Sequence, residues 1–202
     1  MKTILTLVFS LLIPLLAPLH AHAQAPDGSP EELVRKVTTD VLEAIKQDPG
    51  LQAGDKRKAL QLAEQKVLPH IDFAEATQLA VGKAWNSASP EQKEQLVNSF
   101  RTMLVRIYSN AIDVYRGQTM RTLPVRLQPN ATEVTVRNQY LKEGQPPVPV
   151  EYAMKKTSEG WKIYDISVEG VSLVQTYRAE FDNISRTQGV EGLIKKLKER
   201  TA

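Results

Sequence analysis

Apolar residues recur at every third or fourth position in the first half of the chain and again near its C-terminus, which is the period of an amphipathic helix. Polar N-cap residues, prolines and glycines mark where these helices begin and end. The predicted helices run from Ser29-Pro30 to Asp48, from Asp55 to near Pro69, from Asp72 or Phe73 to Val81, from Ser89 to Gly117, from Val171 to about Arg186 and from Val190 to Lys198. The longest begins with Ser89-Pro90-Glu91-Gln92, a capping-box pattern in which the first and last residues bond each other's backbone N–H.

Between residues 123 and 168 the apolar period changes to two, which is typical of strands with one buried face. Turn-like segments separate four predicted strands, which carry Leu123, Val125 and Leu127; Val134, Val136 and Tyr140; Val148, Val150, Tyr152 and Met154; and Trp161 to Val168. Helices, then an antiparallel meander, then helices indicate an α+β fold, with a curved four-stranded sheet wrapped by helices. We expect a single domain over residues 31–202 with a helical N-terminal half.

The last predicted strand changes phase midway. Trp161 and Ile163 fall on one face, whereas Tyr164, Ile166 and Val168 fall on the other. A bulge near Tyr164-Asp165, or a strand covered on both faces, would account for the switch. Gly170 is the predicted corner between this strand and the helix that starts at Val171.

Residues 1–23 have the pattern of a secretory signal peptide. Lys2 precedes an uncharged apolar run from Ile4 to Leu16, and Ala21-His22-Ala23 supplies the small-residue cleavage pattern. The run is too short to span a bilayer, which takes about 20 apolar residues. Cleavage after Ala23 would leave a polar leader over residues 24–30, which we expect to be disordered, and place the mature chain in the periplasm of a Gram-negative source.

The residue types leave little room for catalysis. The chain has no Cys and three His, of which His20 and His22 would leave with the signal peptide. His70 alone cannot form a Cys/His or Ser/His pair or a metal cluster, and we interpret it as a structural or capping residue at a helix end. Asp165 and Glu169 are interpreted as hinge or cap groups, with a glycosidase pair as an alternative. We therefore expect no enzyme, no metal, no cofactor and no nucleic-acid binding.

Three passages carry a resemblance to a known family. They are Val67-Leu-Pro-His-Ile-Asp-Phe73 with Leu79-Ala-Val-Gly-Lys83 and Trp85; Ser89-Pro-Glu-Gln92 leading to Phe100, Tyr108 and Tyr115; and Trp161, Tyr164-Asp165, Glu169-Gly-Val-Ser172, Tyr177-Arg178 and Phe181. In order and spacing they resemble the MlaC family, also called the toluene-tolerance (Ttg2) family, of periplasmic phospholipid-binding proteins. The resemblance spans roughly residues 31–197, which is nearly the whole mature chain.

The resemblance implies a carrier that shuttles glycerophospholipid between the inner and outer membranes and so maintains outer-membrane lipid asymmetry. Its implied partners are an inner-membrane ABC transporter complex and an outer-membrane lipoprotein–porin complex. The implied fold is a strongly curved sheet whose helices enclose an apolar cavity, with the acyl chains inside and the headgroup at solvent. Such cover is needed because two acyl chains with about 30 methylenes, at about 0.8 kcal/mol each, would cost on the order of 20 kcal/mol to expose to water.

The apolar faces that would meet in this cavity supply the candidate lining residues. They are Phe73, Leu79, Phe100, Leu104, Ile107, Tyr108, Val134, Val136, Val150, Tyr152, Ile166, Val171, Val174 and Tyr177. Lys83 and Arg178 are the candidates for contact with the headgroup at the mouth. Each apolar candidate has an alternative interpretation as ordinary core, because a helix stripe or an alternating strand face usually packs only against protein.

Two other functions compete with lipid carriage. One is a periplasmic chaperone or lipoprotein carrier that shelters apolar protein segments, and the other is a hydrolase, against which the missing catalytic set argues. Four cations near the C-terminus, Lys195, Lys196, Lys198 and Arg200, form either a solvated helix face or a docking patch for anionic headgroups or acidic partners. We expect the protein to be a monomer.

Overall fold

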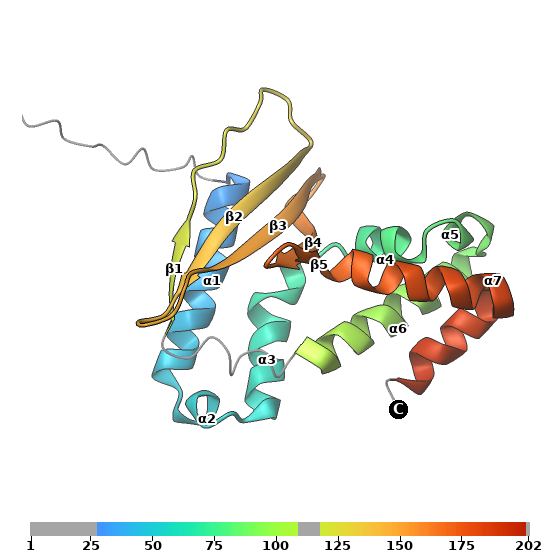
Figure 1. Ribbon diagram of the computed structural model, residues 1–202, viewed down its shortest axis with the longest axis horizontal. Coiled ribbons are helices and arrows are strands. Elements are labelled where there is room, and N and C mark those ends of the chain that lie inside the picture. The colour runs from blue at the N-terminus through green and yellow to red at the C-terminus, as the bar shows by residue number, and fades with distance from the viewer. Residues whose placement is uncertain (1–27, 109–117, 201–202) are drawn as a thin grey trace, which may run out of the picture.

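The computed structural model describes residues 28–108 and 118–200. The predicted signal peptide, most of the predicted leader and the end of the long helix up to Gly117 lie outside the described residues. In chain order the elements are α1 (Pro30–Gln47), α2 (Pro49–Gln52), α3 (Lys56–Lys66), η1 (Leu68–His70), α4 (Phe73–Val81), α5 (Ala84–Ser87), α6 (Pro90–Tyr108), β1 (Thr119–Thr122), β2 (Glu133–Leu141), β3 (Val148–Thr157), β4 (Gly160–Val168), β5 (Val171–Ser172) and α7 (Leu173–Glu199). The sheet, α1 and α3 lie at one end of the molecule, and α4 to α7 lie at the other (Figure 1).

Four of the predicted helix starts are confirmed by their caps, whereas the helix predicted from Val171 begins at Leu173, with Ser172 as its N-cap. Ser29 Oγ accepts a hydrogen bond from the Glu32 N–H at 3.1 Å, and Asp55 and Asp72 cap α3 and α4 in the same way. At α6 the Gln92 N–H donates to Ser89 Oγ at 3.2 Å, while the Ser89 N–H donates to Gln92 Oε1 at 2.9 Å. This reciprocal pair is the predicted capping box.

The sheet is antiparallel in the order β1-β2-β3-β4-β5, with five strands where four were predicted. The first strand was predicted around Leu123 to Leu127 but lies earlier, at Thr119–Thr122. Leu123 still donates to the Arg137 carbonyl at 2.8 Å, but Pro124 has no N–H and cannot continue the ladder. The additional strand, β5, pairs with β4 through a two-residue turn in which Glu169 and Gly170 have φ of 51° and 82°. The corner predicted at Gly170 is therefore a tight hairpin turn with both central residues left-handed.

The phase change in β4 is a β-bulge. Ala153 of β3 pairs with Asp165 and the next residue, Met154, pairs with Ile163, so Tyr164 is the extra residue. The predicted bulge is confirmed, but the predicted division of the strand between two faces is wrong. The inserted residue resets the alternation, and Trp161, Ile163, Ile166 and Val168 all join the same cluster on one face of the sheet.

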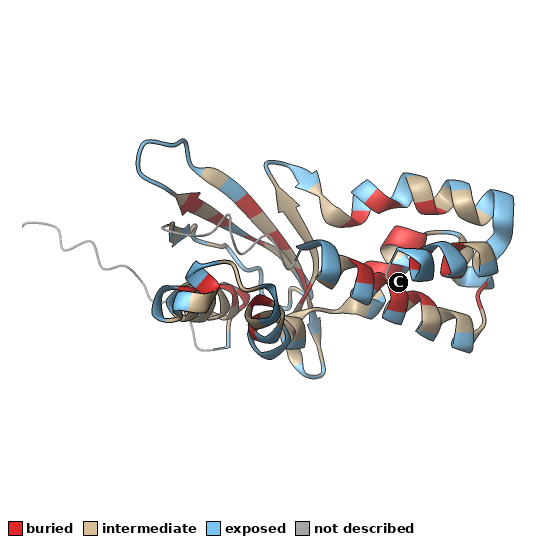
Figure 2. Cartoon of the chain, turned by 90° about the horizontal axis from the view of Figure 1, so that it is seen from below, coloured by how far each residue is buried: buried red, intermediate tan, exposed pale blue. Residues whose placement is uncertain are grey.

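Buried residues form two large clusters and a small one. The sheet cluster comprises Val34 of α1 with Val136, Tyr140, Val150, Tyr152, Met154, Trp161 and Ile163. The helical cluster is built from α4 to α7 and includes Leu96, Phe100, Met103, Val174, Tyr177, Phe181, Leu193 and Leu197. The small cluster joins α1, α2 and α3. Figure 2 shows the corresponding pattern of buried residues alternating along the strands and repeating along one side of each helix.

Helix α4 is tied to β4 by contacts that connect the sheet with the helical end. The Asp72 N–H donates to the Ile163 carbonyl at 2.8 Å, and Ile71 forms an isolated bridge with the same residue. Lys155 on β3 pairs with Glu75 on α4 at 3.2 Å, which raises the pKa of the Lys155 ammonium. These contacts fix α4 against the edge of the bulged strand.

Helix α7 breaks at Gly189, between the two helices predicted from the sequence. Gly189 has φ 69° and ψ −175°, a backbone conformation that essentially only glycine adopts. The break turns the last segment back toward α6 (Figure 1), so that Leu193, Ile194 and Leu197 are buried in the helical cluster. The last segment of α7 thus contributes one buried face to the core, while most of its other side chains are exposed.

Gly189→Ala should lower the free energy of unfolding by about 1–3 kcal/mol, because a Cβ makes this backbone conformation strained. Urea denaturation measures the change. Gln188→Ala is the matched control, since Gln188 is exposed and adjacent, and it should change stability by less than about 0.5 kcal/mol. Equal stabilities for Gly189→Ala and the control would show that the break tolerates a side chain.

Candidate functional site

The residues predicted to line a cavity are divided between the two large clusters. Val134, Val136, Val150, Tyr152 and Ile166 belong to or pack on the sheet cluster, whereas Leu79, Phe100, Leu104, Val174 and Tyr177 belong to or pack on the helical cluster. Phe73 is half-buried, and its ring lies 5.7 Å from the Arg101 guanidinium. The structure thus brings each set together but keeps the two sets in separate clusters.

The apolar face of the sheet contains polar groups that the alternating pattern concealed. Tyr140 and Tyr152, both buried, place their hydroxyl oxygens 2.9 Å apart. Asn138 lies between Val136 and Tyr140 on β2 and is only 1% exposed. Asn138 was missed in the sequence, although a polar residue at an apolar position of an alternating strand was the available signal. The apolar sheet face therefore offers hydrogen-bonding groups as well as hydrocarbon surface.

The helical cluster is centred on three aromatic rings. Phe100 meets Tyr177 and Phe181 edge to face, with ring centroids 5.4 and 5.3 Å apart, and the latter two rings stack at 5.6 Å. Burial, together with a hydrogen bond to the Tyr108 hydroxyl, raises the pKa of Tyr177 to about 12. The close aromatic contacts and full burial of Phe100 mark this set as tightly packed core.

The raised pKa of Tyr177 predicts a loss of stability at alkaline pH. Its hydroxyl stays protonated in the folded chain up to pH of about 12, whereas an unfolded tyrosine ionises near 10.0. Between these two pH values the unfolded state has lost a proton that the folded state keeps. As the pH rises, the free energy of unfolding should therefore fall by about 1.4 kcal/mol per pH unit because of Tyr177. Below pH of about 10 this group should contribute no pH dependence.

Urea unfolding across this range, compared with Tyr177→Phe, isolates the contribution. Tyr108→Phe is the matched control, because it removes the hydrogen bond but leaves Tyr177 buried, and burial is the larger cause of the shift. The control should retain most of the slope. If Tyr177→Phe has the same alkaline slope as the wild type, Tyr177 does not titrate as expected.

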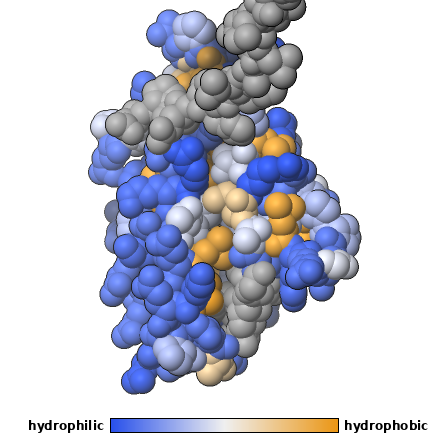
Figure 3. Space-filling view, turned by 90° about the vertical axis from the view of Figure 1, so that its left-hand side faces the viewer, coloured by the Kyte–Doolittle hydropathy of each residue, from blue (hydrophilic) through white to orange (hydrophobic). Residues whose placement is uncertain are grey.

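Three predicted lining residues are exposed to solvent. Val171 at the start of β5 is 62% exposed, and Ile107 and Tyr108 at the end of α6 are 46% and 37% exposed. Figure 3 shows apolar side chains gathered along the middle of one end of the molecule, between hydrophilic margins. Exposed apolar residues beside a buried apolar face are typical of ligand or interaction sites.

The two cations predicted at the mouth lie near each other at the end of α4. The Arg178 guanidinium donates to the Leu79 carbonyl at 2.8 Å, where it satisfies the C-terminus of that helix. The same guanidinium lies 3.5 Å from the position that a Cβ of Gly82 would take, and exposed Lys83 follows directly. Arg178 thus has a structural contact, and both side chains remain accessible from solvent.

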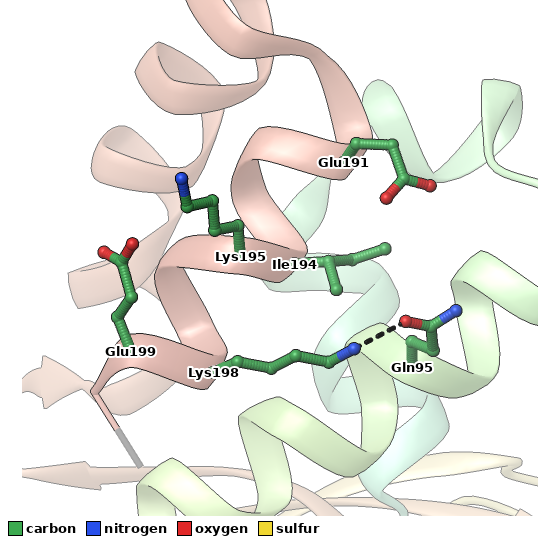
Figure 4. A pocket seen from close by; sticks show the side chains of 6 residues that line it. All are labelled: Gln95, Glu191, Ile194, Lys195, Lys198 and Glu199. Atoms are coloured by element: carbon green, nitrogen blue, oxygen red, sulfur yellow. Dashed lines mark hydrogen bonds between the residues drawn. The ribbon is translucent and has the colours of Figure 1, made fainter. Parts of the chain in front are cut away.

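A pocket of about 410 Å³ lies between α6 and the end of α7 (Figure 4). Its lining consists of Gln95, Glu191, Ile194, Lys195, Lys198 and Glu199. Lys198 donates to Gln95 Oε1 at 2.8 Å, Lys196 pairs with Glu199 at 2.9 Å, and Arg200 pairs with Glu180. The proposed basic patch is therefore interspersed with carboxylates, and Ile194 is the one apolar residue among the six that line this pocket, whereas pockets for apolar ligands are lined mainly by apolar side chains.

The remaining candidates for chemistry have structural roles. The Asp165 carboxylate accepts from Ser172 Oγ at 2.5 Å and from the Val174 N–H at 3.1 Å, which confirms its interpretation as a cap. His70 ends η1, and partial burial and the charges of Lys162 and Lys36 lower its pKa. Within residues 28–108 and 118–200, no three His, Asp or Glu side chains gather as a metal site would need. No helix in the same ranges combines the length and apolarity needed to cross a bilayer.

Comparison with solved structures finds a close match in fold. A phospholipid-binding protein from Ralstonia solanacearum, solved in complex with a phospholipid, is 38% identical to this chain. The match has a TM-score of 0.77 and covers 85% of this chain and 96% of the other.

Two curated relatives match over most of their length. The intermembrane phospholipid transport system binding protein MlaC of Haemophilus influenzae is 22% identical, with 98% of this chain and 91% of the relative covered. The toluene tolerance protein ttg2D of Pseudomonas putida is also 22% identical, over 80% of this chain and 75% of its own. The family model described as MlaC protein matches residues 35–199, so the chain belongs to the MlaC family.

Proposed function

We propose that this protein carries glycerophospholipids, with the acyl chains held against the apolar face of the sheet. The observation that carries the proposal is the 38% identical relative from Ralstonia solanacearum, which was solved in complex with a phospholipid and matches 85% of this chain. The buried apolar face of β2, β3 and β4, with exposed Val171 at its edge, supports the same assignment. Burial of acyl methylenes there supplies the driving force.

The proposed carrier works between two membranes in the periplasm. The relative from Haemophilus influenzae is a component of an intermembrane phospholipid transport system, which supports this compartment. The proposed partners are an inner-membrane ABC transporter complex, which supplies energy, and an outer-membrane lipoprotein–porin complex. The protein itself acts as a single domain without catalysis, holding lipid as cargo rather than as a cofactor.

Native mass spectrometry of gently purified protein tests the proposal. We expect added mass equal to one or more phospholipids, and solvent extraction followed by lipid analysis should identify them. Delipidated protein should regain the mass when it is mixed with phospholipid vesicles. A protein that stays empty under these conditions and instead captures unfolded polypeptide would be a chaperone for apolar segments.

Val171→Trp should lower phospholipid occupancy, because an indole at the edge of the sheet narrows access to its apolar face. The exposed position should accept the larger side chain with a change in stability of less than about 0.5 kcal/mol. Val171→Thr, which keeps the size of the side chain, should retain wild-type occupancy. Native mass spectrometry and thermal melting measure the two quantities, and unchanged occupancy in the Trp variant would place the entry elsewhere.

A further inference from the structure

Asn138 carries a buried amide without a hydrogen-bond partner. The residue is 1% exposed, and within the part of the chain that the structure describes neither Nδ2 nor Oδ1 is hydrogen-bonded. Its strand neighbours on the same face, Val136 and Tyr140, are also buried. Because a buried amide without partners destabilises a fold, its presence in the middle of an apolar face calls for a ligand.

The strand register places Asn138 between two tyrosines on the same face of the sheet. Asn138 pairs with Val150 on β3, and the next pairs on the same face of the sheet, two positions away in each direction, are Tyr140 with Val148 and Val136 with Tyr152. The two tyrosines therefore lie one pair to each side of Asn138, and their hydroxyl oxygens meet at 2.9 Å. The amide and the hydroxyl pair thus belong to adjacent positions on one face of the sheet, and we call them the polar spot of this face.

The described residues that flank Asn138 in the sheet are uncharged. Across the sheet, Asn138 is flanked by Thr122 on β1 and Val150 on β3, and Val168 lies beyond. Val34 from α1 joins the same cluster. A phosphate would need a cation to offset the cost of burial, whereas a neutral carbonyl oxygen needs only one N–H donor. The chemistry of these sheet neighbours favours an ester carbonyl over a phosphate.

We propose that the Asn138 Nδ2 amide donates a hydrogen bond to an ester carbonyl of the bound phospholipid and so positions the glycerol backbone on the sheet. This inference rests on the proposed function. The contact would distinguish acyl esters from alkyl ethers, since an ether-linked lipid has no carbonyl to accept the bond. The protein would then bind two lipids of equal chain length and equal headgroup with different affinities if one is ester-linked and the other ether-linked.

Delipidated wild-type protein tests this with two phosphatidylglycerols that carry identical chains, one ester-linked and one ether-linked. In competition, followed by native mass spectrometry, we expect the diester to be preferred about tenfold, because the diether leaves the amide unpaired. Equal binding of both lipids would overturn the inference while leaving the carrier function intact. Binding of neither lipid would instead refute the proposed function.

Asn138→Leu should remove the preference by binding the two lipids equally, and its delipidated form should melt at a higher temperature than the delipidated wild type. Gln139→Leu is the matched control. It removes an amide from the next residue of β2, whose side chain is on the opposite face and contacts Arg121, so the preference should persist. Asn138→Ala serves the same test if the leucine does not fit. If a folded Asn138 variant still prefers the ester-linked lipid, another group recognises the ester carbonyl.

Discussion

Phe100→Ala should lower the free energy of unfolding by about 3–5 kcal/mol, the range typical of truncating a large buried aromatic side chain. Phe100 is fully buried and contacts both Tyr177 and Phe181 through the edge or face of its ring. Its removal leaves a cavity at the point where α6 meets α7, and tight packing on all sides prevents collapse into it. Urea denaturation followed by circular dichroism measures the loss.

Asn98→Ala provides the control for this substitution. Asn98 lies on the exposed side of the same helix, half a turn away, so its truncation removes no buried contact. We expect a change of less than about 0.5 kcal/mol. A loss below about 1 kcal/mol for Phe100→Ala would mean that the helical cluster is loosely packed and adapts around the missing ring.

Met154→Ala should lower the free energy of unfolding by about 2–5 kcal/mol, because Met154 is fully buried in the sheet cluster beside the bulge. Lys156→Ala, at an exposed position on the same strand, is the control.

The chain contains two tryptophans, and each reports on a different cluster. Trp161 is part of the sheet cluster and Trp85 packs against the helical cluster.

Variants with a single tryptophan, Trp85→Phe and Trp161→Phe, show whether the two clusters unfold together. We expect Met154→Ala to shift the fluorescence transitions of both probes to the same lower urea concentration, since α4 is bonded to β4 through Asp72. A shift confined to the Trp161 signal would mean that the sheet and the helical end are separate cooperative units.

The local elements were predictable because their determinants are local. The starts of α1, α3, α4 and α6 follow from Ser29, Asp55, Asp72 and Ser89, each of which bonds backbone N–H groups within three residues. The break at Gly189 also coincides with a glycine. Such signals depend on a few neighbouring residues and can be recognised without knowledge of the tertiary structure.

What could not be predicted depends on contacts between distant segments. The first strand was placed too late, because the apolar alternation around Pro124 outweighed the missing N–H. The division of apolar residues into a sheet cluster and a helical cluster is a property of packing that periodicity does not contain. The same is true of Asn138, whose burial without a partner is visible only once β1, β2 and β3 are in register.

The extra residue in β4 has a consequence for comparing this chain with its relatives. If Tyr164 were instead paired as an ordinary strand residue, every following position would be inverted, turning Asp165 and Ser167 toward the apolar cluster and Ile166 and Val168 away from it. The Asp165 carboxylate would then lose the Ser172 hydroxyl and the Val174 N–H that it now holds. Deletion of Tyr164 would restore the regular ladder and leave these orientations unchanged, so a one-residue gap at this point in an alignment marks loss of the bulge and not a change in side-chain orientation over the rest of the strand.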